Sequence, residues 1–182
     1  RGGDFQSAYI RALECCIEVQ AAAYGSRLAS RLEGLFPDDE RFQKHFSVAR
    51  AELHLMAGET DAAIALLKQV VSANPGWVEG RVRFAGALSA AGRHAEAIRI
   101  IGELPKELLA QPETQALLAD FKGRSGEIKA VEAICLKALE KSPDNSALLN
   151  VMAYWLSFSR DKLEAAESAA LKAFRAEPHN IH

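Results

Sequence analysis

The chain has 182 residues, 49% of them hydrophobic, and its 22 basic and 24 acidic side chains give a net charge of −2 at pH 7. This length and composition suffice for a substantial core, whereas the even charge balance argues against a general attraction to nucleic acid or to an anionic membrane. No apolar run approaches the roughly 20 residues that cross a bilayer as a helix, so direct membrane insertion is not expected.

Residues 1–39 are expected to form N-terminal helices that make up a partial, irregular repeat. An apolar helical stripe runs through Phe5, Tyr9, Ala12 and Cys16. A further helix follows within residues 20–35, and Pro37 marks its end because proline cannot continue a helix interior. The chain opens without an initiating Met, so we expect it to be an excerpt of a longer protein from which a targeting segment could be missing.

Residues 40–182 are expected to be organised by a pattern that recurs every 34 residues. A glycine is followed five positions on by a small residue and four positions later by an apolar one. The three copies are Gly58, Ala63 and Leu67; Gly92, Ala97 and Ile101; and Gly126, Val131 and Cys135. A fixed period of this kind is typical of stacked-repeat proteins, in which each copy contacts only its neighbours.

The physical roles of the pattern predict pairs of helices and no strand. Glycine adopts the left-handed backbone conformation that ends one helix and begins the return, and the small residue lets the two helices approach closely. Pro75 and Pro143 then stop the second helix. The predicted copies span about 40–75, 76–110, 111–144 and 145–178, with Arg160 in place of the glycine in the imperfect fourth copy.

These motifs make residues 40–178 resemble the tetratricopeptide repeat family. Small residues at its other positions also match, namely Ala51, Ala85, Ala119, Ala138 and Ala173. Val131 in place of alanine, the missing fourth glycine and the lack of a tryptophan-type residue early in each copy depart from the pattern. The resemblance implies an all-α, right-handed superhelical solenoid of antiparallel helix pairs, with about four repeats following the N-terminal helices.

The resemblance also implies a protein–protein interaction scaffold, not an enzyme, whose first helices line a concave groove for a peptide or partner protein. Transfer of the family's groove positions gives Val48, Glu52, Leu55, Glu79, Val82, Gly86, Ser89, Glu113, Asp120, Asn150, Tyr154 and Phe158. The acids and aromatic residues in this set favour a ligand segment with basic and apolar side chains. The subclass that grips a C-terminal carboxylate is rejected, because only Arg83 among the corresponding sites could donate to an anion.

No arrangement of residues predicts catalysis, a cofactor or a metal site. The glycines do not form a phosphate-binding loop, and His179 and His182 are weak evidence for a metal. His54 is expected to be satisfied within a helix pair. The three cysteines, an odd number with two adjacent, are expected to be free thiols in a reducing, cytoplasmic compartment.

Several alternatives stay open at this point. The chain could be the regulatory or substrate-docking domain of a larger enzyme, or it could self-associate through exposed solenoid ends. Base-by-base RNA recognition by helical repeats is disfavoured by the acidic groove candidates and the net charge. Tyr154, Trp155 and Phe158 form either a binding platform or a contact with a further copy. The alanine-rich composition suggests a bacterial source.

Overall fold

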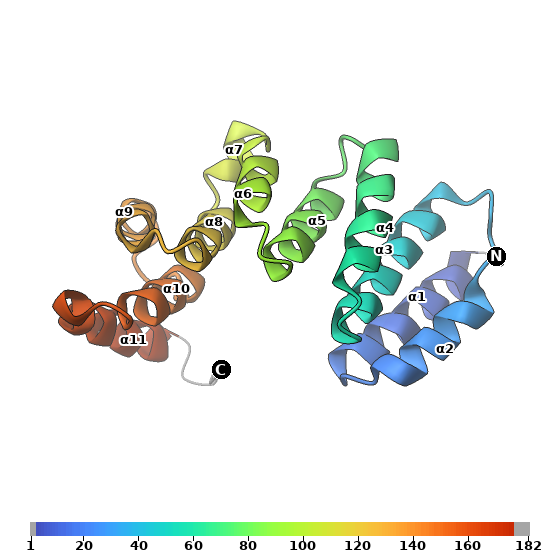
Figure 1. Cartoon of the computed structure of the whole chain (residues 1–182), viewed down its shortest axis with the longest axis horizontal. Helices are drawn as coiled ribbons and strands as arrows, with labels where there is room; N and C mark the ends of the chain where they lie inside the picture. The colour runs from blue at the N-terminus through green and yellow to red at the C-terminus, as the bar shows by residue number, and fades with distance from the viewer. Residues whose placement is uncertain (1–2, 177–182) are drawn as a thin grey trace. The chain divides into compact units, whose positions relative to one another are not determined.

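The computed structural model describes residues 3–176, and every regular element among them is a helix (Figure 1), which confirms the all-α prediction. The chain divides into two compact units, Arg1–Ala91 and Gly92–His182. The first contains α1 (Gly3–Glu18), α2 (Ala22–Leu32), α3 (Glu40–Met56), α4 (Thr60–Ala73) and α5 (Val78–Ala90). The second contains α6 (His94–Gly102), α7 (Lys106–Leu109), α8 (Pro112–Arg124), α9 (Ile128–Leu139), α10 (Ser146–Leu156), the 3-10 helix η1 (Arg160–Lys162) and α11 (Leu163–Ala176).

In the first unit, α1, α2 and α3 pack around a shared apolar core. Its buried members are Leu13, Ala29, Leu32, Phe42, Phe46, Ala49 and Leu53. The start of α3 is fixed by Asp39, whose side chain accepts a hydrogen bond from the backbone N–H of Phe42 at 2.8 Å. Such a cap contributes about 1 kcal/mol to helix stability. The N-terminal helices are therefore anchored to the first full helix pair.

The glycines at the 34-residue spacing adopt the predicted left-handed conformation. Gly58, Gly92 and Gly126 have φ values of 78°, 76° and 83°. The fourth turn reverses the chain without a left-handed residue, because Ser159 is extended and the 3-10 helix follows it directly. Gly34, with φ 78°, is a further left-handed glycine that lies outside this spacing. It lies between α2 and α3.

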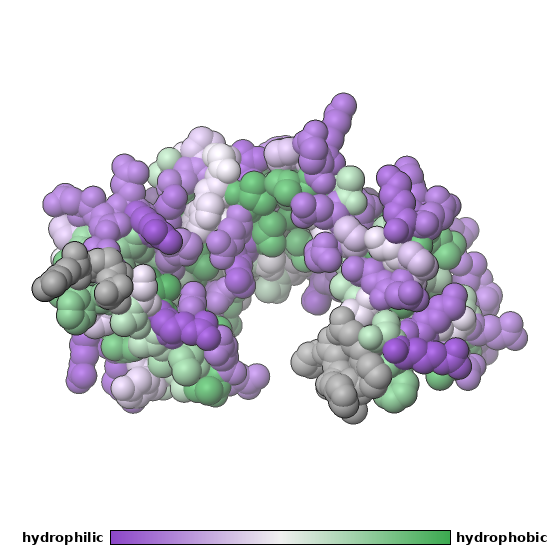
Figure 2. Space-filling view, turned by 180° about the vertical axis from the view of Figure 1, so that it is seen from behind, coloured by the Kyte–Doolittle hydropathy of each residue, from purple (hydrophilic) through white to green (hydrophobic). Residues whose placement is uncertain are grey.

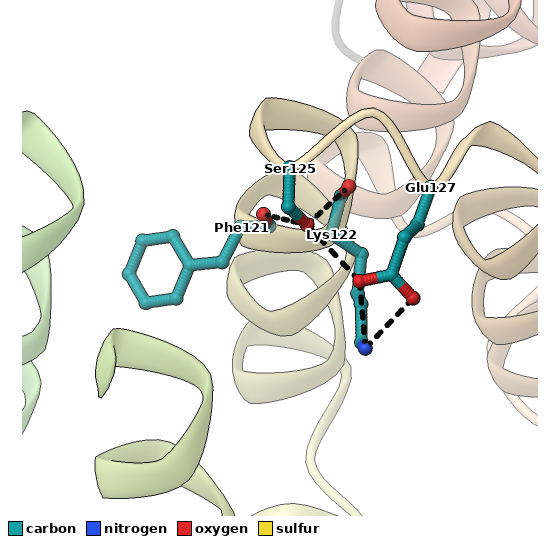
Figure 3. A network of polar contacts seen from close by, with 4 residues as sticks. All are labelled: Phe121, Lys122, Ser125 and Glu127. Carbon is teal, nitrogen blue, oxygen red and sulfur yellow. Dashed lines mark hydrogen bonds and ion pairs between the residues drawn. The ribbon is translucent and has the colours of Figure 1, made fainter. Parts of the chain in front are cut away.

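Polar side chains reinforce the turn between α8 and α9 (Figure 3). Ser125 Oγ lies 2.9 Å from the carbonyl oxygen of Lys122 and 3.1 Å from Glu127 Oε1. Lys122 Nζ donates to both carboxylate oxygens of Glu127 at 3.0 Å. The hydrogen bond from Lys122 lowers the pKa of Glu127. These contacts satisfy polar groups at the end of α8, where backbone carbonyls lose their helical partners.

The second unit has a core of small and aliphatic side chains from α8, α9, α10 and α11. Val131 and Cys135 of α9 are fully buried there, so the valine is accommodated where the repeat pattern has alanine. Burial raises the pKa of the Cys135 thiol to about 11, which keeps it protonated at neutral pH.

Polar side chains cover much of the molecular face in Figure 2, with hydrophobic patches between them.

Candidate peptide-binding groove

A cavity of about 340 Å³ opens in the first unit, where α1, α3 and α5 all contribute side chains. We call it the acidic groove. Its lining consists of Arg11, Glu14, Ile17 and Glu18 from α1, His45, Val48, Ala49 and Glu52 from α3, and Glu79 and Arg83 from α5. On each helix these residues recur at intervals of three or four, which places them on one helical face. Four carboxylates and two guanidinium groups therefore line one cavity.

The floor of the acidic groove is apolar. Val48 and Ala49 are 8% and 3% exposed, and Ile17 packs against the core formed by α1, α2 and α3. The charged side chains rise from the same helical faces. A ligand side chain with an aliphatic stem and a charged end would match this combination, since the stem can lie on apolar surface while its charge meets the carboxylates.

Both arginines of the acidic groove are paired with carboxylates. Arg83 Nη1 lies 2.5 Å from Glu52 Oε1 and joins α5 to α3. Arg11 Nη1 lies 3.3 Å from Glu14 Oε2 and 3.6 Å from Glu18 Oε1, all within α1. No ion-pair partner of Glu79 is found among residues 3–176. The groove thus holds more negative than positive charge.

The pKa of Glu52 in the acidic groove is raised above its usual value. Burial of the carboxylate is the main cause, and the nearby charges of Glu79 and Glu14 add to it, while Arg83 opposes it. One guanidinium partner therefore does not fully compensate the partly buried negative charge. A second cation at this position would be favoured, because ion pairs strengthen as solvent is excluded.

The groove residues predicted from the repeat register supply part of this lining. Val48, Glu52 and Glu79 line this cavity, whereas Leu55, Val82 and Gly86 do not. Ser89 is buried and does not line this cavity either.

The acidic groove also contains residues that the sequence prediction missed. Arg11, Glu14 and Glu18 all belong to α1, which lies outside the 34-residue register, so transfer by offset could not reach them. The charged stripe at spacings of three and four along α1 was the available signal.

The predicted groove residues of the second unit have different roles. Asp120 accepts a hydrogen bond from Trp155 Nε1 at 3.0 Å and pairs with Arg124 Nε at 2.7 Å. Glu113 and Asn150 are exposed. The Asp120 carboxylate is therefore already engaged within the fold.

Three aromatic residues lie at the end of α10 and in the turn that follows it, and they differ in exposure. Tyr154 and Phe158 are 57% and 66% exposed, and their rings meet edge to face at a centroid distance of 5.2 Å. The ring of Trp155 instead lies against Gly123 of α8. Trp155 thus packs within the repeat array, whereas Tyr154 and Phe158 keep surface that a partner could cover.

The described residues offer little for other chemistry. They contain no cluster of three or more His, Cys, Asp or Glu side chains arranged to hold a metal ion. His54 Nδ1 lies 2.6 Å from Glu59 Oε2 and so has a partner, while His179 and His182 lie outside the described residues. No described helix has both the length and the apolar character needed to cross a membrane.

Comparison with protein families identifies the repeat. Residues 54–121, from the end of α3 into α8, match the family described as tetratricopeptide repeat, which confirms the resemblance seen in the sequence. Tetratricopeptide repeats are known in general as protein-interaction repeats, and the all-helical fold of this chain agrees with such repeats. The match supports a protein-interaction scaffold in general.

Solved structures show the same fold over nearly the whole chain. MamA 41-end from Desulfovibrio magneticus RS-1 is 14% identical, with a TM-score of 0.66 and coverage of 100% of both chains. MamA MSR-1 C2 is 13% identical, with a TM-score of 0.61 and coverage of 97% of this chain and 98% of that one. No curated protein matches the sequence. At these identities the likeness establishes the fold.

Proposed function

We propose that this chain binds a basic segment of a partner protein in the acidic groove. The observation that carries the proposal is the surplus of carboxylates in that cavity, where Glu14, Glu18, Glu52 and Glu79 outnumber two guanidinium groups that are already paired. A cationic side chain from a partner would reduce this surplus. Complementary charge across an interface favours both the rate of encounter and the choice of partner.

The structure supports an arginine or lysine as the anchoring side chain. Glu79 lacks an ion-pair partner among the described residues, and the Glu52 carboxylate is partly buried with a raised pKa. The aliphatic stem of the ligand side chain would lie on the apolar floor, where Ile17 keeps more exposed surface than Val48 and Ala49.

We propose no catalytic step, metal, cofactor or nucleic acid partner for the acidic groove. A cytoplasmic location, attachment to a larger enzyme and self-association through exposed ends are separate predictions, and binding in the acidic groove is compatible with each. Exposed apolar side chains on α11, such as Leu171 and Phe174, favour the last of them.

Fluorescence anisotropy with two labelled peptides tests the proposal. One peptide alternates arginine with alanine, and the other has glutamate in place of arginine. We expect the basic peptide alone to bind. The double variant Glu52→Gln with Glu79→Gln should weaken binding by about tenfold or more, because a charge-assisted contact contributes about 1.5–3 kcal/mol.

A matched double variant controls for net charge. Glu140→Gln with Glu164→Gln removes two exposed carboxylates from the second unit and should bind the basic peptide like the wild type. Equal losses in the two double variants would show that binding depends on general charge alone and would contradict the groove. Preference for the acidic peptide would contradict it as well.

A further inference from the structure

The ion pair between Arg83 and Glu52 is asymmetric. The Glu52 side chain retains 22% of its accessible surface, whereas that of Arg83 retains 49%. The carboxylate is therefore set into the acidic groove, and the guanidinium group approaches it from the more exposed side. Arg83 is also the groove's cation that pairs with a carboxylate of another helix, since Arg11 pairs with acids of its own helix.

We infer that Arg83 is a built-in competitor: it occupies the cation position on Glu52 in the free protein, and the ligand's basic side chain displaces it. This inference rests on the proposed function, because it concerns the same cavity and the same class of ligand. The affinity for the ligand then depends on how readily its basic side chain replaces Arg83 on the Glu52 carboxylate. Arg83 is thus a specificity-determining residue that holds affinity down.

The two partners differ in what they lose when the pair opens. A half-exposed arginine returns to water at little cost, because ion pairs near the surface are weak and its long side chain regains rotamer freedom. The Glu52 carboxylate, by contrast, stays partly desolvated and needs a cation. Replacement of Arg83 by another cation therefore costs less free energy than leaving the Glu52 carboxylate without a cation.

Glu79 offers the displaced Arg83 a second position. It precedes Arg83 by four residues on α5, the order in which an acid and a base interact favourably along a helix. Both side chains line the acidic groove, and no ion-pair partner of Glu79 is found in the described part of the chain. Arg83 can thus move from Glu52 to Glu79 without leaving its own helix.

The test compares affinities for the basic Arg-Ala peptide by fluorescence anisotropy, at low and at physiological salt. Arg83→Met and Arg83→Gln each remove the competing charge and should bind the peptide roughly three- to tenfold more tightly than the wild type, with the larger gain at low salt. Arg83→Lys keeps a cation and should bind close to the wild type. Circular dichroism verifies that each variant folds. Because Met is apolar and Gln is polar, a similar gain in both variants would come from the loss of the Arg83 charge.

Arg99→Met is the control for net charge, because Arg99 forms an exposed ion pair with Glu103 in the second unit. It should leave affinity unchanged. Unchanged or weaker binding by both Arg83→Met and Arg83→Gln would overturn the inference while leaving the proposed function standing, since the wild type would still bind. If the wild type itself does not bind the basic peptide, both are overturned. Tighter binding by Arg99→Met equal to that of Arg83→Met would overturn the specific role of Arg83.

Discussion

The indole ring of Trp155 in α10 lies on the backbone of Gly123 in α8, where an added Cβ atom would collide with the ring. The absence of a side chain at residue 123 is therefore a packing requirement. The indole N–H also reaches the Asp120 carboxylate, one turn before the glycine on the same helix. Successive repeats of the second unit are joined by this contact.

Substitution of this glycine should destabilise the protein. Gly123→Ala forces the Trp155 ring to move and should lower the free energy of unfolding by about 1–3 kcal/mol, the usual cost of overpacking. Gly86→Ala is the matched control, because a Cβ at this helical position meets nothing within 4 Å. It should raise stability by about 0.5–1 kcal/mol. Urea denaturation measures both, and equal effects of the two substitutions would contradict this packing.

The hydrogen bond between Trp155 and Asp120 should be detectable as a coupling energy. In a double-mutant cycle with Trp155→Phe and Asp120→Ala, we expect about 1 kcal/mol of interaction, as for a partly exposed hydrogen bond. The single variants and the double variant are compared by urea denaturation. Additive losses of stability would show that the bond contributes nothing.

The turn at Gly126 should depend on its left-handed backbone. Gly126→Ala places a Cβ at φ 83° and should cost about 1–2 kcal/mol. Arg160→Gly, at the corresponding position of the fourth copy, should not stabilise the protein, because this turn contains no left-handed residue. Thermal melts of both variants test the contrast. A gain in stability with Arg160→Gly would mean that the fourth turn is a strained version of the others.

Glu52 should make stability depend on pH. Its pKa is higher in the folded protein than the ordinary 4.5, so its ionised form opposes folding above the folded pKa, and this penalty disappears as the pH falls below the unfolded value. Glu52→Gln should therefore raise the melting temperature at pH 7 and lose this advantage near pH 4. A variant less stable than the wild type at pH 7 would contradict the dominance of burial over the Arg83 ion pair.

The regular part of the fold was predictable because local chemistry determines it. Glycines at 58, 92 and 126 need the left-handed conformation wherever the chain reverses, so their spacing alone located helix ends. The N-terminal helices lack that register, although Gly34 uses the same conformation. Their contribution to the acidic groove depends on how α1 packs against α3, which no residue spacing reveals.

The candidate site was predictable only where the repeat geometry determines it. The offsets brought Val48, Glu52 and Glu79 to one cavity, but they also selected Asp120, whose carboxylate binds Trp155. A partner 35 positions away in the next copy decides whether an acid is available to a ligand. Sequence offsets describe positions on a helix and do not include such tertiary hydrogen bonds.

A titration with the unlabelled Arg-Ala peptide, followed by amide NMR, shows directly whether the acidic groove binds basic segments. We expect chemical-shift changes concentrated in α1, α3 and α5, with residues near Glu14, Glu52 and Glu79 affected most. The Glu-Ala peptide should leave the same signals unchanged. Changes concentrated in the second unit, or of equal size with the two peptides, would contradict the claim.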